Sequence, residues 1–360
     1  MVGAIVVFVV IFSLLVLAHE AGHFWAARRV GIKIDEFGIG FPPRIKSFKR
    51  RGVVYSFNWI PFGGFVKLHG ESGEDIPDKM AFSSKTPLER IWVIISGVLM
   101  NFLVGMVLLM IGFWLRMPPL VTPVEQLVGA TNQVESKVVV MKIVENSPAA
   151  SANLVAGDFI LGSGEVIFST PNDFKDFLTD KAGKQTSFLI GREGEELVVD
   201  ITPASSTEGV IIGAWIDRSI EKVSYVWWKV PWLAVKEIGM LLLVISQAIT
   251  GLIYQLFTTA TIPADLSGPV GIARITVDLM RLGWMRILQF IIFLSLNLGI
   301  INLVPFPGLD GGRLAFVLVE MARGGRKLST STENAVNTVG FLLIVLLVLV
   351  VTYKDVLKII

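Results

Sequence analysis

The sequence predicts an α-helical polytopic membrane protein with about four transmembrane helices, a membrane-associated β-hairpin and one inserted extracytoplasmic domain of α+β or β-sandwich type. Of its 360 residues, 53% are hydrophobic and only 17% are charged. The mean hydropathy is +0.67, which is typical of an integral membrane protein. Apolar runs at residues 2–17, 91–115, 287–303 and 340–351 supply the predicted spans, whereas residues 120–220 have the composition of a soluble domain.

Charge and cysteine content exclude several kinds of function. The net charge of +2 is too small to suggest nucleic-acid binding. The absence of cysteine excludes disulfides, thiolate metal sites and a cysteine nucleophile together. Because the only histidines are His19, His23 and His69, a metal site beyond two imidazoles would need a carboxylate.

The first candidate site is the HExxH motif of His19, Glu20 and His23. On a helix the two histidines lie one turn apart on the same face, so both imidazoles can reach one ion, and Glu20 lies beside them to take a proton from a metal-bound water. Residues 2–17 are almost all apolar, so the motif ends a predicted transmembrane helix, where ionisable side chains indicate function. The alternative is two buried histidines and a glutamate that extends to the membrane surface.

The first span is predicted to remain uncleaved and to end on the cytoplasmic side. A secretory signal peptide carries lysine or arginine before its apolar run. No lysine or arginine precedes the apolar run of this chain. Basic residues follow it instead, and cytoplasmic segments are rich in them. They are Arg28, Arg29, Lys33, Arg44, Lys46, Lys49, Arg50 and Arg51.

Residues 53–68 are predicted to form a β-hairpin. Residues 53–60 have aromatic and β-branched strand character, residues 61–64 form a turn, and residues 65–68 return as a second strand. The hairpin is either a small sheet that caps the cytosolic side or a hairpin in the membrane whose edge pairs with an extended substrate. His69 is predicted to be a solvated loop residue.

The second span, residues 91–115, carries Asn101 in its middle, and the helix is predicted to start near Ser83. An isolated asparagine in a membrane helix usually holds helices together. A place for Asn101 at the candidate site is the less favoured interpretation.

Residues 120–220 are predicted to fold as a separate domain. Strand character is found at residues 138–144, 186–190 and 196–201, and residues 172–178 form an amphipathic helix. The order of Ser-Pro-Ala-Ala at 147–150, Gly-Asp at 157–158 and then a strand resembles a PDZ domain of the bacterial protease type. Such a domain binds peptides by strand addition; the alternative is a spacer without a ligand.

Residues 238–257 are long enough to span a membrane but are predicted to lie at its interface. If they crossed it, residues 287–303 would run in the opposite direction, and Asp310 would end on the far side from His19. Basic residues after Asp310 also indicate a cytoplasmic end, namely Arg323, Arg326 and Lys327. Predicted interface anchors precede the helix, and they are Tyr225, Trp227, Trp228, Lys229 and Trp232. The chain thus divides into residues 1–119, 120–220, 221–265 and 266–360.

The second candidate site is the segment 302–312, with the sequence NLVPFPGLDGG. Pro305 and Pro307 end the preceding span and keep the backbone extended, and the glycines allow a sharp turn with Asp310 directed inward. Asp310 supplies the third zinc ligand that two histidines lack, which leaves the fourth position for water. The alternative is that Asp310 caps the helix predicted at residues 311–321.

With these motifs the chain resembles the site-2 protease family of intramembrane zinc metalloproteases, and most of all the bacterial sigma-regulator type with PDZ domains. The motifs are HExxH at 19–23, GGFVK at 63–67, SGPVGIA at 267–273 and the segment 302–312. The resemblance implies that His19, His23 and Asp310 hold Zn²⁺ and that Glu20 is the catalytic base. One departure is that residues 120–220 have room for one PDZ domain, whereas well-known Gram-negative members carry two.

The resemblance also implies that Asn302 positions the substrate and that the hairpin engages it. The candidate substrate-binding residues are Asn302, Gly63, Gly64, Phe65, Val66, Lys67, Leu68, Pro305 and Pro307.

These observations predict a zinc metalloendopeptidase of the bacterial cytoplasmic (inner) membrane that performs regulated intramembrane proteolysis. The active site is expected near the cytoplasmic side and the PDZ domain in the periplasm. Expected partners are the lipid bilayer, single-span substrates such as anti-sigma factors of stress signalling or remnant signal peptides, and a peptide ligand of the PDZ domain, but no nucleic acid. The alternatives are a metal sensor or transporter that uses the same cluster, and a non-catalytic scaffold that presents its PDZ domain.

Overall fold

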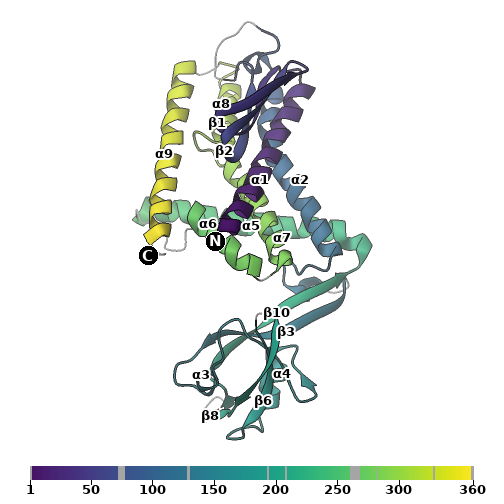
Figure 1. Cartoon of the computed structure of the whole chain (residues 1–360). Helices are drawn as coiled ribbons and strands as arrows, with labels where there is room; N and C mark the ends of the chain where they lie inside the picture. Colours follow the sequence, from purple (N-terminus) through teal and green to yellow (C-terminus); the bar gives the residue numbers. More distant parts are fainter. Residues whose placement is uncertain are drawn as a thin grey trace. The chain divides into compact units, whose positions relative to one another are not determined.

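The structure of this chain is a computed structural model that describes residues 2–71, 78–127, 130–192, 194–206, 209–259, 268–281, 283–326 and 329–357. The chain forms two compact units (Figure 1). We call Met1–Gly112 with Trp232–Ile360 the membrane unit, and Phe113–Pro231 the β unit.

Among the described residues, five helices are long and apolar enough to cross a membrane. They are α1 (Val2–Arg29), α2 (Pro87–Trp114), α5 (Val230–Thr259), α7 (Trp284–Leu303) and α9 (Thr330–Leu357). Two shorter helices, α6 (Pro269–Arg281) and α8 (Asp310–Ala322), complete the membrane unit. The four predicted spans fall on α1, α2, α7 and α9, so these four helices are confirmed as elements.

The outer faces of these helices carry large apolar side chains. On α1, Val6, Val10 and Leu14 are each more than half exposed, and on α9 the same holds for Leu342 and Leu346. In water such an apolar surface would promote aggregation, whereas in a bilayer it contacts the hydrocarbon chains of the lipid. The exposed pattern therefore agrees with helices that face lipid.

Helix α5 is the element on which the predicted topology depends. It contains residues 238–257 and is one of the five helices that could cross a membrane. In Figure 1 it runs across the direction of α1 and α9. Its placement at the interface stays a prediction, because length and composition allow either location.

The sheet beside α1 consists of β1 (Ile34–Arg50) and β2 (Val53–Leu68). Both predicted strand segments of the hairpin form, but their predicted pairing is wrong, because each pairs with β1 rather than with the other. Residues 53–58 pair with residues 44–50, and residues 34–39 lie between residues 54–57 and 64–68. Among the described residues, 64–68 pair on one side only, so they form an edge of the sheet.

Glycines explain why β1 escapes recognition in the sequence. Glycine is rare in strands, and Gly38 and Gly40 break the β-branched and aromatic pattern. In the structure the Phe65 ring covers Gly38, where a Cβ would lie 2.3 Å from a ring carbon. Gly40 has φ of +74°, and a Cβ there would lie 2.4 Å from the carbonyl oxygen of Ile60. The residues that weaken the strand signal are those that permit the close pairing.

Close packing holds the HExxH segment of α1 between the sheet and α2. A Cβ on Gly22 would lie 2.3 Å from the carbonyl oxygen of Ser96, so the two helix backbones touch there. One apolar cluster joins α1, both strands and α2. Its buried members are Ala26, Ala27, Ile32, Ile34, Val53, Leu68 and Val93.

The glycine-rich segment before α6 is tied to α9. Asp355 is buried, and its Oδ2 accepts from the backbone N–H of Gly268 at 2.8 Å and of Gly271 at 2.7 Å. These bonds satisfy donors at the start of α6, which packs against α1. The SGPVGIA motif therefore has a structural explanation in this fold, although its Ser267 lies outside the described residues.

The β unit has an antiparallel sheet in the order β10-β3-β4-β6-β7, with β5 paired to β4. A core of apolar side chains that includes Phe168, Phe174 and Phe188 fills it. The strands predicted at 138–144, 186–190 and 196–201, the helix predicted at 172–178 and the strand predicted after Gly157 and Asp158 are confirmed, whereas β10 is not predicted. The elements are β3 (Thr131–Ile143), α3 (Pro148–Ser151), β4 (Phe159–Ser163), β5 (Val166–Ile167), α4 (Pro171–Leu178), β6 (Thr186–Arg192), β7 (Glu195–Ile201), β8 (Ala204–Ser206), β9 (Gly209–Ile211) and β10 (Ala214–Tyr225).

Tyr225 is not the exposed interface anchor that the sequence suggests. It ends β10, is buried, and its hydroxyl donates to the carbonyl oxygen of Met117 at 2.8 Å. Its ring lies 4.7 Å from that of Phe113. A tyrosine whose hydroxyl finds a partner can be buried as readily as phenylalanine, and sequence does not show the partner. Trp227, Trp228 and Trp232 are exposed, and their role as anchors stays a prediction.

Candidate metal centre

The two histidines of the HExxH motif lie next to each other inside the membrane unit. Helix α1 places His19 and His23 one turn apart, and both side chains are buried. Their Nε2 atoms are 3.1 Å apart, and the rings stand at 85° to each other. Both rings thus present the same nitrogen to one point in space.

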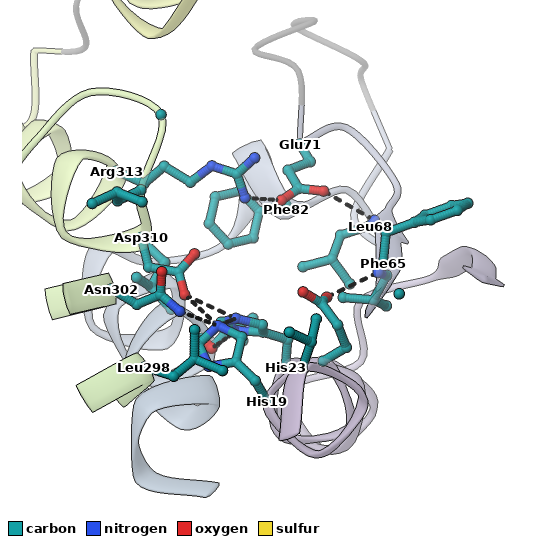
Figure 2. A pocket seen from close by; sticks show the side chains of 18 of the residues that line it. His19, His23, Phe65, Leu68, Glu71, Phe82, Leu298, Asn302, Asp310 and Arg313 are labelled. Atoms are coloured by element: carbon teal, nitrogen blue, oxygen red, sulfur yellow. Dashed lines mark hydrogen bonds and ion pairs between the residues drawn. The ribbon is translucent and has the colours of Figure 1, made fainter. Parts of the chain in front are cut away.

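Asp310 brings a carboxylate to that point from the far end of the sequence. Its Oδ2 lies 2.9 Å from His19 Nε2 and 3.0 Å from His23 Nε2 (Figure 2). The alternative role of Asp310 as a helix cap does not fit, because Leu309 is the N-cap residue and Asp310 is the first residue of α8.

The loop that carries Asp310 is folded too tightly for larger residues. A Cβ on Gly311 would lie 2.2 Å from the carbonyl oxygen of Val304, and one on Gly312 would lie 2.4 Å from that of Phe306. Gly308 has φ of +91°, which disfavours any other residue. The glycines therefore fold the loop back on itself and direct the carboxylate toward α1.

The donor set fits a zinc ion. Among the described residues, His19, His23 and Asp310 are the group of three whose ligand atoms converge closely enough to hold a metal. Two imidazoles and one carboxylate are a common set for catalytic zinc, which keeps one position open. Tetrahedral bonds of about 2.0 to 2.1 Å would set the ligand atoms roughly 3.3 Å apart, slightly more than the 2.9–3.1 Å observed. A small outward shift of each side chain would therefore admit the ion.

Helix α2 contacts the rear of both imidazoles. His23 Nδ1 lies 2.8 Å from the carbonyl oxygen of Val93, and His19 Nδ1 lies 3.2 Å from Nδ2 of Asn101. Gly97 lies between them, where a Cβ would come within 2.4 Å of His23 Nε2 and 2.8 Å of His19 Cε1. A glycine at this position leaves the space that both rings fill.

Glu20 faces the edge of the sheet. Its Oε2 accepts from the backbone N–H of Val66 at 2.9 Å. Both residues line a cavity of about 430 Å³ together with the two histidines and Asp310. A carboxylate thus lies beside the converging ligand atoms, in a space large enough for a peptide segment.

A second carboxylate accepts a hydrogen bond from the next outward-facing backbone N–H of the same edge. Glu71 Oε2 accepts from the backbone N–H of Leu68 at 3.2 Å, and Glu71 Oε1 accepts from Nη1 of Arg313. The negative charge of Glu71 raises the pKa of the Arg313 guanidinium. Figure 2 shows this ion pair across the cavity from the histidines. Strand β2 and helix α8 are therefore joined at the wall of the site.

A comparison with protein families decides the identity of the chain. The model of Peptidase family M50 matches residues 7–347, nearly the whole sequence. The chain belongs to peptidase family M50. A Clostridium perfringens protein assigned as a zinc metalloprotease is 32% identical over 350 residues, which cover 96% of each chain. The regulator of sigma-W protease RasP of Bacillus subtilis is 27% identical over 99% of this chain and 98% of its own.

Membership in family M50 confirms the resemblance drawn from the motifs. The chain is a zinc metalloprotease and a multi-pass membrane protein. Among solved structures, the PDZ domain of an SdrC-like protein of Listeria monocytogenes is 25% identical, covers 22% of this chain and 86% of its own, and has a TM-score of 0.21.

In this M50 peptidase, five of the nine predicted substrate-binding residues line the cavity. They are Asn302, Gly64, Phe65, Val66 and Leu68. Asn302 comes closest to the ligand atoms, with its Nδ2 3.4 Å from His19 Nε2. This amide therefore lies within reach of a group bound at the metal position.

The other four predicted residues lie outside the cavity lining. Lys67 and Pro305 are exposed, Lys67 because successive side chains of a strand alternate between faces. Gly63 is buried, and its N–H donates to Ser13 Oγ at 3.0 Å. Pro307 packs against α9, where a Cβ on Gly340 would lie 2.2 Å from its carbonyl oxygen.

Sequence reasoning did not assign Glu71, Arg313 or Gly97 to the site, and it favoured a different role for Asn101. Asn101 and Gly97 could have been found from spacing, because they follow Val93 at intervals of four and share a face of α2. Glu71 and Arg313 carry no such signal, since an acid and a base 242 positions apart become partners only in the fold. His69, predicted to be solvated, is largely buried between Asp35 and Asp78 and is not part of the metal cluster.

Proposed function

We propose that this M50 peptidase cleaves single-span membrane proteins within the bilayer, with zinc held by His19, His23 and Asp310 and with Glu20 as the general base. The observation that carries the proposal is the convergence of three ligand atoms, 2.9–3.1 Å apart, beside a carboxylate in a cavity. Zinc at this position supplies a Lewis acid for the peptide carbonyl and lowers the pKa of a water to about 7.

Glu20 transfers the proton, and Asn302 stabilises the negative charge that develops on the substrate carbonyl oxygen. Val66 holds Glu20 by one oxygen, Oε2, and the other oxygen, Oε1, takes the proton from the attacking water and later delivers it to the leaving amine. The Asn302 amide, 3.4 Å from His19 Nε2, donates to the carbonyl oxygen of the scissile bond as it becomes negative.

The edge of β2 is the proposed docking site for an unwound substrate. A transmembrane helix satisfies its backbone groups internally, so a segment that unwinds needs new partners inside the membrane. Residues 64–68 offer such partners by strand addition. In the free enzyme the N–H groups of Val66 and Leu68 are taken by Glu20 and Glu71. Binding therefore exchanges at least the Glu71 bond for one to the substrate.

The proposed setting is the bacterial cytoplasmic membrane, with the active site near the cytoplasmic side and α5 at the interface. Basic residues after α1 support this orientation. The β unit is then a periplasmic PDZ domain that binds a peptide or excludes large ectodomains. The name of the Bacillus subtilis relative, regulator of sigma-W protease, favours anti-sigma factors over remnant signal peptides as substrates.

The decisive experiment measures zinc content and cleavage of a single-span reporter in detergent for the wild type, Glu20→Gln and Asp310→Ala. We expect about one zinc per wild-type chain, retention of zinc without cleavage in Glu20→Gln, and loss of both in Asp310→Ala. Wild-type turnover by Glu20→Gln would remove Glu20 as the base. Zinc binding without cleavage of any substrate would favour a sensor or a scaffold instead.

A further inference from the structure

Asn101 is a polar residue in the middle of α2 that the proposed reaction does not use. Its side chain is fully buried, and its Oδ1 has no hydrogen-bond partner among the residues that the structure describes, although its Nδ2 lies 3.2 Å from His19 Nδ1. A buried carbonyl oxygen without a hydrogen-bond partner destabilises the fold. A carboxamide in this state, directed at the rear of a candidate metal ligand, indicates a function.

The proton on the His19 ring decides which amide atom should face it. His19 directs Nε2 at Asp310 and His23, so a metal at that point would bind the Nε2 lone pair. A neutral imidazole with a free lone pair on Nε2 carries its proton on Nδ1. The atom opposite Nδ1 must then be an acceptor. Rotation of the Asn101 amide by half a turn exchanges its two atoms and supplies Oδ1.

We propose that Asn101 is a positioning residue that accepts the Nδ1–H of His19 through Oδ1 and so fixes the ring for zinc binding. Metal-bound histidines usually donate their second ring N–H to a carboxylate or carbonyl, which sets both tautomer and orientation. The inference deepens the proposed metal centre and rests on it. It adds a member of the site that lies behind the ligand rather than beside the substrate.

Two further contacts support this role. His23 already has the equivalent arrangement, with Nδ1 2.8 Å from the carbonyl oxygen of Val93, which lies on the same face of α2 about two turns before Asn101. Asn101 is itself held in place, because Ser295 Oγ donates to its backbone carbonyl at 2.8 Å. Ser295 lies on α7, the helix that leads into the Asp310 loop. One face of α2 therefore orients both rings, and α7 fixes that face.

The test compares Asn101→Leu and Asn101→Asp with Asn297→Leu in the full-length protein. The control asparagine lies on α7, and within the described part of the chain its side chain donates only to the carbonyl oxygen of Phe293 on its own helix. Zinc affinity is measured by competition with a chelator, and Co²⁺ absorption reports the ligand geometry. We expect Asn101→Leu to lose about 10- to 100-fold in zinc affinity. Asn101→Asp, which keeps an acceptor, should stay within about threefold of the wild type, and the control should be unchanged.

Either of two results would overturn the proposal. One is a folded Asn101→Leu chain with wild-type zinc affinity and cobalt spectrum. The other is an Asn101→Asp chain that binds zinc as weakly as Asn101→Leu, because an amide N–H would then be the required group. If Asn101→Leu does not fold, Asn101→Asp alone decides. A wild-type chain without zinc would instead contradict the metal centre itself, so the two failures are distinguishable without any measurement of proteolysis.

Discussion

The two units differ in where their polar and apolar side chains lie. The β unit is filled by apolar residues, and the rings of Phe168 and Phe188 lie 5.3 and 5.6 Å from that of Phe174. In the membrane unit, polar residues are buried while valines and leucines cover the outside. His19, His23 and Asn101 lie inside it, as does an ion pair of 2.6 Å between Arg90 on α2 and Glu320 on α8.

This contrast shows which residues reveal stability in water and which reveal helix contacts and the site in a bilayer. In water, burial of apolar surface drives folding, so the buried phenylalanines of the β unit describe stability. In a bilayer the lipid is as apolar as a leucine, so apolar residues say little about contacts. The buried polar residues of the membrane unit are costly there, and each needs a partner. They consequently mark the helix contacts and the site.

The largest expected effect is a loss of zinc affinity in Gly97→Ala, a change confined to the membrane unit. The added Cβ would lie 2.4 Å from His23 Nε2 and 2.8 Å from His19 Cε1, so the rings must leave their positions. We expect zinc affinity to fall by more than the roughly 10- to 100-fold typical of a change behind a ligand, while the β unit keeps its fold. Chelator competition measures the affinity.

Gly239→Ala on α5 is the matched control, because its Cβ would meet nothing within 4 Å. It should leave zinc binding unchanged. Wild-type zinc affinity in Gly97→Ala would mean that the rings are not confined by α2.

The counterpart in the β unit is Phe174→Ala. Removal of this buried ring should destabilise the β unit by about 3 to 5 kcal/mol, because it leaves a cavity among the other rings. Hydrogen exchange of β4 and β6 amides in the full-length protein measures the loss. Zinc affinity should not change. Concurrent loss of zinc would break the comparison, since the two units would then depend on each other for stability.

The same contrast explains what the sequence predicts and what it does not. The helices are evident because residues such as those of α9 form long apolar runs. His19, His23 and Asp310 stand out because ionisable residues are rare in such surroundings. The sequence does not show which strands pair, because a short strand such as residues 65–68 can pair with more than one neighbouring strand. Its partner β1 contains glycines that weaken the strand pattern, and the need for one of them, Gly38, becomes clear only when the ring of Phe65 is seen to cover it.

The site shows the same division. The residue types for a zinc ligand set can be read from spacing, but the groups behind them cannot. Asn101 is an ordinary membrane asparagine until His19 is placed opposite it. Glu71 is one carboxylate among many until Leu68 and Arg313 meet it. These contacts depend on the relative positions of elements, which no local pattern contains.

The smallest predicted effect concerns Glu71, a charged residue that lines the cavity. Glu71→Ala removes the carboxylate from the N–H of Leu68. If a substrate strand takes that N–H, loss of the competitor should lower the KM for a single-span reporter by about threefold to tenfold, the equivalent of one net hydrogen bond. The kcat should change less, because Glu20 and the ligand set remain. Initial-rate kinetics in detergent separate the two constants.

Arg313→Gln is the informative companion, because it removes the ion pair but leaves the carboxylate on Leu68. If the carboxylate alone competes with the substrate, Arg313→Gln should lower KM less than Glu71→Ala does. If KM rises in Glu71→Ala instead, the ion pair orders the edge strand for binding, and the substrate does not exchange with Glu71. The sign of the KM change therefore separates a carboxylate that blocks the edge from one that supports it.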